Sequence, residues 1–268
     1  MHNNKLSESY IGFALHGYEN EILSWLWQTA RFFEKSGYPV KSVTYDIDRN
    51  KVQRKSLKKF QEVIENDTGY PVDKLYSFQV FAGENLRYPA TWNYGCKFDE
   101  PRKELVIFFD ASYGEVNILR FIKEFLKELL QDRCVWGGYL FYQEANYYYP
   151  IGDAYISQNS YEEDGDVWAS LTRPNTIYEM SIANEKAKMQ AALNQKNKYR
   201  HIYPQTILSE HHLEEEFDGL PLTKWIEENS YGNVEKIGAG NWLWTIPTDM
   251  IQGIQVVFYD KNLLLGVK

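Results

Sequence analysis

Three short apolar segments followed by one long amphipathic segment constrain the fold of this chain more than any other feature. Residues 75–81, 91–98 and 104–109 are rich in aromatic and β-branched residues and are separated by Gly, Pro and charged residues, which predicts three successive strands. In residues 115–131 the apolar positions recur at helical spacing, at Leu119, Ile122, Phe125, Leu126, Leu129 and Leu130. The sequence therefore predicts an antiparallel meander with a helix packed on it.

In the N-terminal part, segments with a strand pattern alternate with segments with a helix pattern. Residues 10–17 read as a strand, and Asn20 caps a helix that ends at Ser36-Gly37. Residues 39–45 alternate as a second strand, and residues 51–66 have the pattern of a basic amphipathic helix. Together these segments predict a β-α-β-α order before the meander.

The middle of the chain is more polar. Residues 135–142 form a predicted strand, and a short extended piece follows around 154–156. Residues 157–166 read as an acidic loop. Residues 180–199 contain no Gly or Pro and alternate apolar with basic residues, which predicts a more exposed helix.

The last third contains a helix, a hairpin and an apolar end. Residues 221–229 predict a helix that ends at a glycine, and residues 234–237 and 242–246 flank a Gly-rich turn. Residues 251–259 fit either a strand or a short helix. The apolar residues 263–265 are expected to dock on the core.

These elements predict an α+β fold with a mixed, mainly antiparallel sheet and helices packed on one face. An arrangement of two fused β-α-β-type halves stays open as a variant of this fold. We expect residues 1–268 to form a single domain, with a subdivision near residues 157–175 left open.

Composition favours a soluble protein with unusual aromatic content. The chain has 21 Tyr, 14 Phe and 8 Trp, which is 16% of its residues, and such residues either fill a core or face a partner. The net charge of −8 disfavours general binding to phosphate backbones. Because no signal peptide or transmembrane run is evident, we expect a cytoplasmic protein with no membrane contact. Cys96 and Cys134 have no metal-ligand spacing and are expected to be buried, reduced thiols.

Two sets of side chains resemble metal ligands. In residues 210–216 the pairs His211/Glu214 and His212/Glu215 share a helix face at i, i+3, but the HExxH pattern is absent, so a solvated acidic turn is favoured over a metal site. Asp46, Asp48 and Asp110 follow predicted strands, and carboxylates that meet at a sheet edge can bind Mg²⁺. A metal-dependent hydrolase or nuclease is therefore an alternative, although salt-bridged surface acids account for the same residues.

Nucleophilic and cofactor chemistry find little support. Ser112 lies between a strand and a helix, as in a nucleophile elbow, but Asp110 replaces the first Gly of that motif. Helix capping by Ser112 or Asp110 is the better interpretation. The segment Gly238-Ala239-Gly240 lacks the third glycine of a dinucleotide fingerprint, and a phosphate-binding loop motif is absent, so no cofactor is expected.

Two basic stretches suggest a nucleic-acid-binding module as a second alternative. They are Arg49, Lys51, Arg54, Lys55, Lys58 and Lys59, and then Lys186, Lys188, Lys196, Lys198 and Arg200. Because each lies on a predicted amphipathic helix of an acidic chain, solvated helix faces are favoured and nucleic acid is not the expected partner.

Two acidic stretches are the stronger candidates for a binding surface. Acidic loops with exposed aromatic residues suit a partner with a cationic site, because charge steers association and Tyr or Trp supplies anchoring contacts. The residues are Tyr161, Glu162, Glu163, Asp164, Asp166 and Trp168 in the first stretch and Glu210, Glu214, Glu215 and Glu216 in the second.

The acidic, aromatic-rich composition, the segment Leu105–Asp110 before the helix, and the segments His212-Leu213, Leu222–Ile226 and Trp242–Pro247 resemble bacterial immunity proteins. These proteins neutralise toxins of polymorphic-toxin and type VI secretion systems. The resemblance implies a non-enzymatic partner that occludes the active site of a cognate toxin, such as a nuclease with a basic cleft, and it transfers no functional residue.

Overall fold

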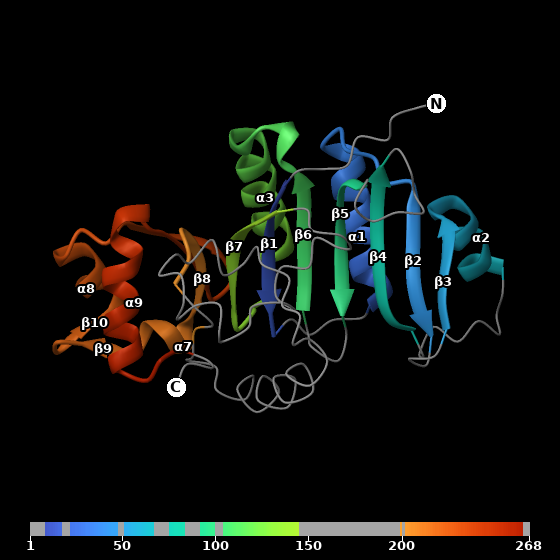
Figure 1. Cartoon of the computed structure of the whole chain (residues 1–268). Coiled ribbons are helices and arrows are strands. Elements are labelled where there is room, and N and C mark those ends of the chain that lie inside the picture. Colours follow the sequence, from blue (N-terminus) through green and yellow to red (C-terminus); the bar gives the residue numbers. More distant parts are fainter. Residues whose placement is uncertain are drawn as a thin grey trace, which may run out of the picture. The chain divides into compact units, whose positions relative to one another are not determined.

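The computed structural model describes residues 9–17, 22–47, 51–66, 75–83, 92–99, 104–144, 199 and 202–264 (Figure 1). Contacts divide the chain into two compact units. The first consists of Met1–Phe13, Tyr18–Phe125 and Tyr142–Gly152, and the second of Ala14–Gly17, Leu126–Phe141 and Asp153–Lys268. Each unit is described below by itself.

The first unit contains an antiparallel sheet with strand order β1-β6-β5-β4-β2-β3. Its strands are β1 (Ser9–His16), β2 (Ser42–Ile47), β3 (Lys51–Ser56), β4 (Leu75–Gly83), β5 (Trp92–Asp99) and β6 (Glu104–Asp110). The predicted meander is confirmed, because β4 pairs antiparallel with β5 and β5 pairs antiparallel with β6.

Helices cover one face of this sheet. They are α1 (Ile22–Lys35), α2 (Leu57–Asn66) and α3 (Glu115–Leu129). The Phe33 ring of α1 stacks on Phe109 with ring centroids 5.8 Å apart, and Phe121 of α3 lies edge-on to the same Phe109 at 4.7 Å. Phe60 of α2 packs on Tyr45 of β2 at 4.7 Å. Many of the chain's aromatic residues therefore pack in the core between this sheet and its helices.

The other face of the sheet carries a separate buried cluster of Tyr10, Phe81, Trp92 and Phe108. Phe81 and Trp92 stack with their ring centroids 3.8 Å apart. Gly95 makes this packing possible, since a Cβ there would lie 2.9 Å from the Cβ of Phe81 and 2.4 Å from a backbone oxygen of β4.

The helix predicted over residues 51–66 is wrong in its first part. Residues 51–56 form β3, which pairs antiparallel with β2 from Ile47↔Lys51 to Ser42↔Ser56, and the helix begins at Leu57. Arg54 shows why a strand is favoured there. Its Nε donates to Thr44 Oγ1 at 3.2 Å, and its guanidinium lies 5.4 Å from the centre of the Phe81 ring. Cross-strand contacts thus override the local helical pattern.

The second unit holds the strand order β11-β12-β8-β7 and a small β10-β9 hairpin. Its strands are β7 (Gly137–Glu144), β8 (Gln205–Ser209), β9 (Glu216–Phe217), β10 (Leu220–Pro221), β11 (Asn233–Gly238) and β12 (Asn241–Thr245). Its helices are α7 (Glu210–Leu213), α8 (Leu222–Glu228) and α9 (Ile251–Asp260), with a short 3-10 turn η4 (Thr248–Met250). The predicted hairpin is confirmed by the antiparallel pairing of β11 with β12.

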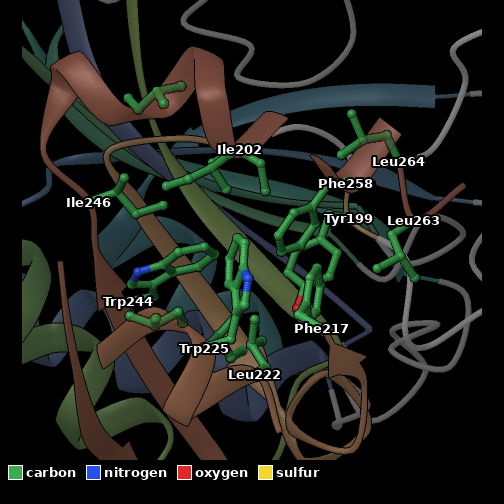
Figure 2. Packing of buried hydrophobic residues seen from close by; sticks show 14 residues of the cluster. Tyr199, Ile202, Phe217, Leu222, Trp225, Trp244, Ile246, Phe258, Leu263 and Leu264 are labelled. Carbon is green, nitrogen blue, oxygen red and sulfur yellow. The ribbon is translucent and has the colours of Figure 1, made fainter. Parts of the chain in front are cut away.

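Aromatic rings from separate elements form the core of this unit (Figure 2). Phe217 of β9 stacks on Trp225 of α8 at 4.6 Å, and Phe258 of α9 lies 4.8 Å from Phe217. Residues 251–259 form a helix, which decides the alternative left open by the sequence, because their buried positions follow helical spacing. Leu263 and Leu264 are buried, so the predicted docking of the apolar end is confirmed.

Asn241 connects three parts of the second unit. Its side-chain oxygen accepts from the Val135 amide at 3.0 Å, and its Nδ2 donates to the carbonyl oxygens of Val135 and Leu208 at 3.0 and 3.3 Å. Cys134, next to Val135, is exposed, which corrects the prediction of a buried thiol. Cys134 follows α3 at the surface, and its Sγ reaches the Ala239 carbonyl at 2.5 Å. Cys96 is buried, as predicted.

The α+β fold class is confirmed. The extended piece at 154–156, the acidic loop at 157–166, the helix at 180–199 and the subdivision near 157–175 lie outside the described residues. None of the helices in the described parts of the chain is long and apolar enough to span a bilayer.

Candidate functional site

The acidic stretch predicted at Glu210, Glu214, Glu215 and Glu216 lies on one continuous surface segment of the second unit. Strand β8 ends at Ser209, α7 makes a single helical turn, and β9 begins at Glu216. We call residues 210–216 the acidic segment. The acidic segment follows a buried strand and precedes the buried Phe217, so both of its ends are anchored in the core.

A buried histidine fixes the start of the acidic segment. The Ser209 backbone N–H donates to His212 Nδ1 at 2.9 Å, and Ser209 Oγ lies 3.0 Å from the same nitrogen. Since a backbone N–H can only donate, Nδ1 is the acceptor and the ring hydrogen resides on Nε2. His212 thus closes a capping box at the start of α7, in the place that Glu or Gln occupies more often.

His212 and Leu213 form the core-facing side of α7. The His212 ring packs on Tyr199 with centroids 4.3 Å apart, and Phe258 meets Tyr199 edge-on at 4.7 Å. Because His212 points into the core, Glu210 and His211 point to solvent. His211 and Glu214 are 51% and 76% exposed, and their 4.0 Å ion pair is of the surface kind that contributes little stability.

The four acidic residues are not equivalent. Glu210, Glu214 and Glu216 are exposed, whereas Glu215 is half-buried. Burial, together with the nearby Glu215 carboxylate, raises the pKa of Tyr199 well above its usual value. Three carboxylates therefore face solvent from this segment.

The C-terminal end of the acidic segment is held by two contacts. The Leu222 amide donates to the Glu215 carbonyl at 3.0 Å, and Lys261 Nζ donates to the Glu216 carbonyl at 3.0 Å. The hairpin turn at Asp218 and Gly219 has φ angles of 53° and 80°, as two-residue turns between antiparallel strands require. The exposed carboxylates are thus carried by a backbone that is already ordered, which lowers the entropy cost of binding.

The other acidic candidates lie in the part of the chain that is not described. Tyr161, Glu162, Glu163, Asp164, Asp166 and Trp168 are all outside the described residues, as is Asp48. The basic residues Lys186, Lys188, Lys196, Lys198 and Arg200 are outside them too.

Asp46 and Asp110, whose convergence at a sheet edge was an open alternative, do not meet. Strand register places Asp46 in one row with Ser77, Asp99 and Glu104, across β2, β4, β5 and β6. Asp110 lies six residues further along β6, which is about 20 Å along the strand, and three strand spacings, or about 14 Å, to the side. Asp110 instead caps the 3-10 turn Ala111–Tyr113 by accepting from the Ser112 amide at 2.8 Å.

The remaining candidates stay separate in the structure. His211 faces solvent while His212 faces the core, so the two histidines do not converge. Within the described ranges, His, Cys, Asp and Glu side chains form no group of three that could hold a metal ion. Of the first basic stretch, Arg54 is engaged on the sheet, and Lys58 and Lys59 are exposed on α2.

The sequence missed the exposed apolar face of α9. Val256 and Tyr259 are 56% and 46% exposed, and Met250 just before the helix is 36% exposed. The available signal is the absence of charged residues from 250 to 259, in a segment that fits either a strand or a short helix.

Comparisons with known proteins find only a distant structural likeness. No protein-family model matches this chain. No curated protein matches it either. A solved structure of the Pseudomonas aeruginosa T6SS protein PA0821 superposes with a TM-score of 0.50 at 10% identity, covering 96% of this chain and 73% of that one. At this identity the likeness establishes a shared fold alone.

Proposed function

We propose that this chain is an immunity protein that binds a bacterial protein toxin and blocks the toxin's active site without catalysing a reaction. The observation that carries the proposal is the acidic segment, where three exposed carboxylates stand on a backbone fixed at both ends. The resemblance to immunity proteins and the fold shared with a T6SS protein support the same class.

The partner that fits such a surface has a basic cleft. Exposed carboxylates attract cationic surfaces over about 10 Å at ordinary salt and speed association with them. A nuclease needs cations to hold phosphates, so a nuclease toxin would present the complementary charge. The residues proposed to contact it are Glu210, Glu214, Glu215 and Glu216, together with Tyr161, Glu162, Glu163, Asp164, Asp166 and Trp168.

Charge reversal tests the proposal. The variant Glu210→Lys/Glu214→Lys/Glu216→Lys should bind the cognate toxin domain at least about tenfold more slowly in 50 mM salt, and its association rate should lose most of its salt dependence. The matched control is Glu34→Lys/Glu62→Lys/Glu65→Lys, which changes the net charge equally at exposed positions of the first unit.

The measurement is the association rate at several salt concentrations, with growth protection against the toxin as the cellular readout. Equal rates for the two triple variants would overturn the role of the acidic segment. A chain of unaltered sequence that fails to bind or protect would overturn the proposed function itself.

A further inference from the structure

The outer face of α9 differs from the outer faces of the other helices. The exposed positions of α8 are Thr223, Lys224, Glu227 and Glu228, and α1 exposes Arg31, Glu34 and Lys35, as solvated helices do. In contrast, the exposed positions of α9 are Gln252, Gly253, Val256 and Tyr259, with a single charged residue, Asp260, at its last position. Four large apolar side chains are exposed among the described residues, and Met250, Val256 and Tyr259 are three of them.

Gly253, Val256 and Tyr259 lie on the outward side of α9. They succeed each other at a spacing of three residues, so at about 100° per residue they span about 120° of the helix circumference. Met250 lies in the 3-10 turn that leads into the helix. The opposite side of α9 packs into the core through Ile251, Ile254 and Phe258. We call Gly253, Val256 and Tyr259, together with Met250 before them, the α9 stripe.

Among the described residues, nothing around Gly253 requires a glycine. Its φ lies outside the left-handed region, and a Cβ built on it would meet nothing within 4 Å. A glycine inside a helix costs about 0.5–1 kcal/mol relative to alanine. In the α9 stripe it exposes bare helix backbone between two apolar side chains, where another surface can approach closely.

Charge beside the α9 stripe indicates what that other surface is. Asp249 and Asp260 are exposed at its two ends, and Lys261 Nζ binds the Glu216 carbonyl, which holds the end of α9 against β9 and the acidic segment. The same Nζ lies 5.0 Å from the centre of the Phe217 ring. The border of the stripe thus carries two carboxylates and one ammonium, and the acidic segment next to it makes the surroundings acidic on balance, the pattern of an apolar anchor with a charged rim.

We propose that the α9 stripe is the apolar anchor of the interface, and that it packs against an apolar patch that is surrounded by basic residues on the toxin. This inference rests on the proposed function and gives each of the two surfaces its own role in binding. The acidic segment attracts the toxin and governs the association rate. The α9 stripe buries apolar area after contact and governs the dissociation rate.

The test uses the full chain and the cognate toxin domain. Val256→Gln/Tyr259→Gln should dissociate at least about tenfold faster, with an unchanged salt dependence of the association rate. Val116→Gln is the matched control, because Val116 is 79% exposed on α3 of the first unit and should leave both rates unchanged. All three side chains are exposed, so the thermal unfolding midpoint should stay the same.

A second variant removes no apolar contact. Gly253→Gln adds a side chain in open space and a better helix former, so the free chain should fold normally while the toxin dissociates faster. Dissociation rates within twofold of the unaltered chain for both α9 variants would overturn the inference and leave the proposed function intact.

Two further outcomes also decide against the α9 stripe. If light scattering shows a dimer that Val256→Gln/Tyr259→Gln converts to a monomer, the stripe binds a second copy rather than a toxin. If the unaltered chain does not bind the toxin domain, the proposed function fails and this inference fails with it.

Discussion

Lys261 Nζ donates a hydrogen bond to the backbone carbonyl of Glu216 at 3.0 Å, which joins the end of α9 to the acidic segment. The same ammonium lies over the Phe217 ring at 5.0 Å. One side chain thus holds the two surfaces proposed to bind the toxin, the acidic segment and the α9 stripe, in a fixed arrangement.

Replacing Lys261 should loosen this arrangement. Lys261→Met keeps the apolar stem but removes the ammonium, and we expect a loss of about 1 kcal/mol in the free energy of unfolding, measured by urea denaturation. Faster hydrogen exchange at residues 214–217 should accompany it. Lys224→Met, at an exposed position of α8, is the control and should change neither quantity.

His212 should be essential for the stability of the acidic segment. His212→Phe keeps a ring against Tyr199 but leaves the buried Ser209 N–H without its acceptor, which costs about 1–3 kcal/mol. His211→Phe changes an exposed position and should stay within about 0.5 kcal/mol of the parent. Nitrogen chemical shifts of the His212 ring should report a hydrogen on Nε2; a hydrogen on Nδ1 would contradict the capping role.

The hydrophobic pattern of a single segment was enough to predict the helices and strands whose structure depends mainly on their own residues. The apolar stripe of 115–131 specifies α3, the pattern of 75–81 specifies β4, and the continuous apolar run of 105–109 specifies β6, which is buried on both faces. Residues 51–56 failed this test. Their conformation depends on pairing with β2 and on the contacts of Arg54 across the sheet, and such cross-strand contacts do not show in the periodicity of residues 51–66 themselves.

The charge of the candidate site could be predicted from the sequence, but the contacts that hold its backbone in place could not. A run of acids identifies residues 210–216 directly, and the lack of cations around it is visible in the sequence. The capping box is not visible, because His212 stands where the pattern expects Glu or Gln. The failure of Asp46 and Asp110 to meet is equally hidden, since it follows from strand order and register across β2, β4, β5 and β6.

Gly253→Ala should stabilise the free chain by about 0.5–1 kcal/mol, because alanine loses less backbone entropy in a helix and its Cβ enters open space. Gly238→Ala is the contrasting variant. A Cβ at Gly238 would lie 2.1 Å from the Leu130 carbonyl oxygen. Gly238→Ala should therefore lower the free energy of unfolding by more than Gly253→Ala raises it. Urea denaturation of both variants checks the pair, and equal effects would contradict the geometry around either glycine.

Tyr94 should make the first unit sensitive to alkaline pH. Burial, with Tyr113 and Tyr38 adjacent, raises the pKa of Tyr94 to about 12 from its usual 10.0, and its hydroxyl donates to the Pro39 carbonyl at 3.2 Å. Because the native state holds this proton more tightly than the unfolded chain, the associated stabilisation is complete below pH 10 and is lost as pH rises through 12. Denaturant unfolding at pH 9, 10 and 11 should show stability falling with pH, and Tyr94→Phe should weaken that fall. Tyr259→Phe, at an exposed position, should leave the fall unchanged; an identical pH profile for Tyr94→Phe and the parent would show that the Tyr94 hydroxyl does not retain its proton as the structure requires.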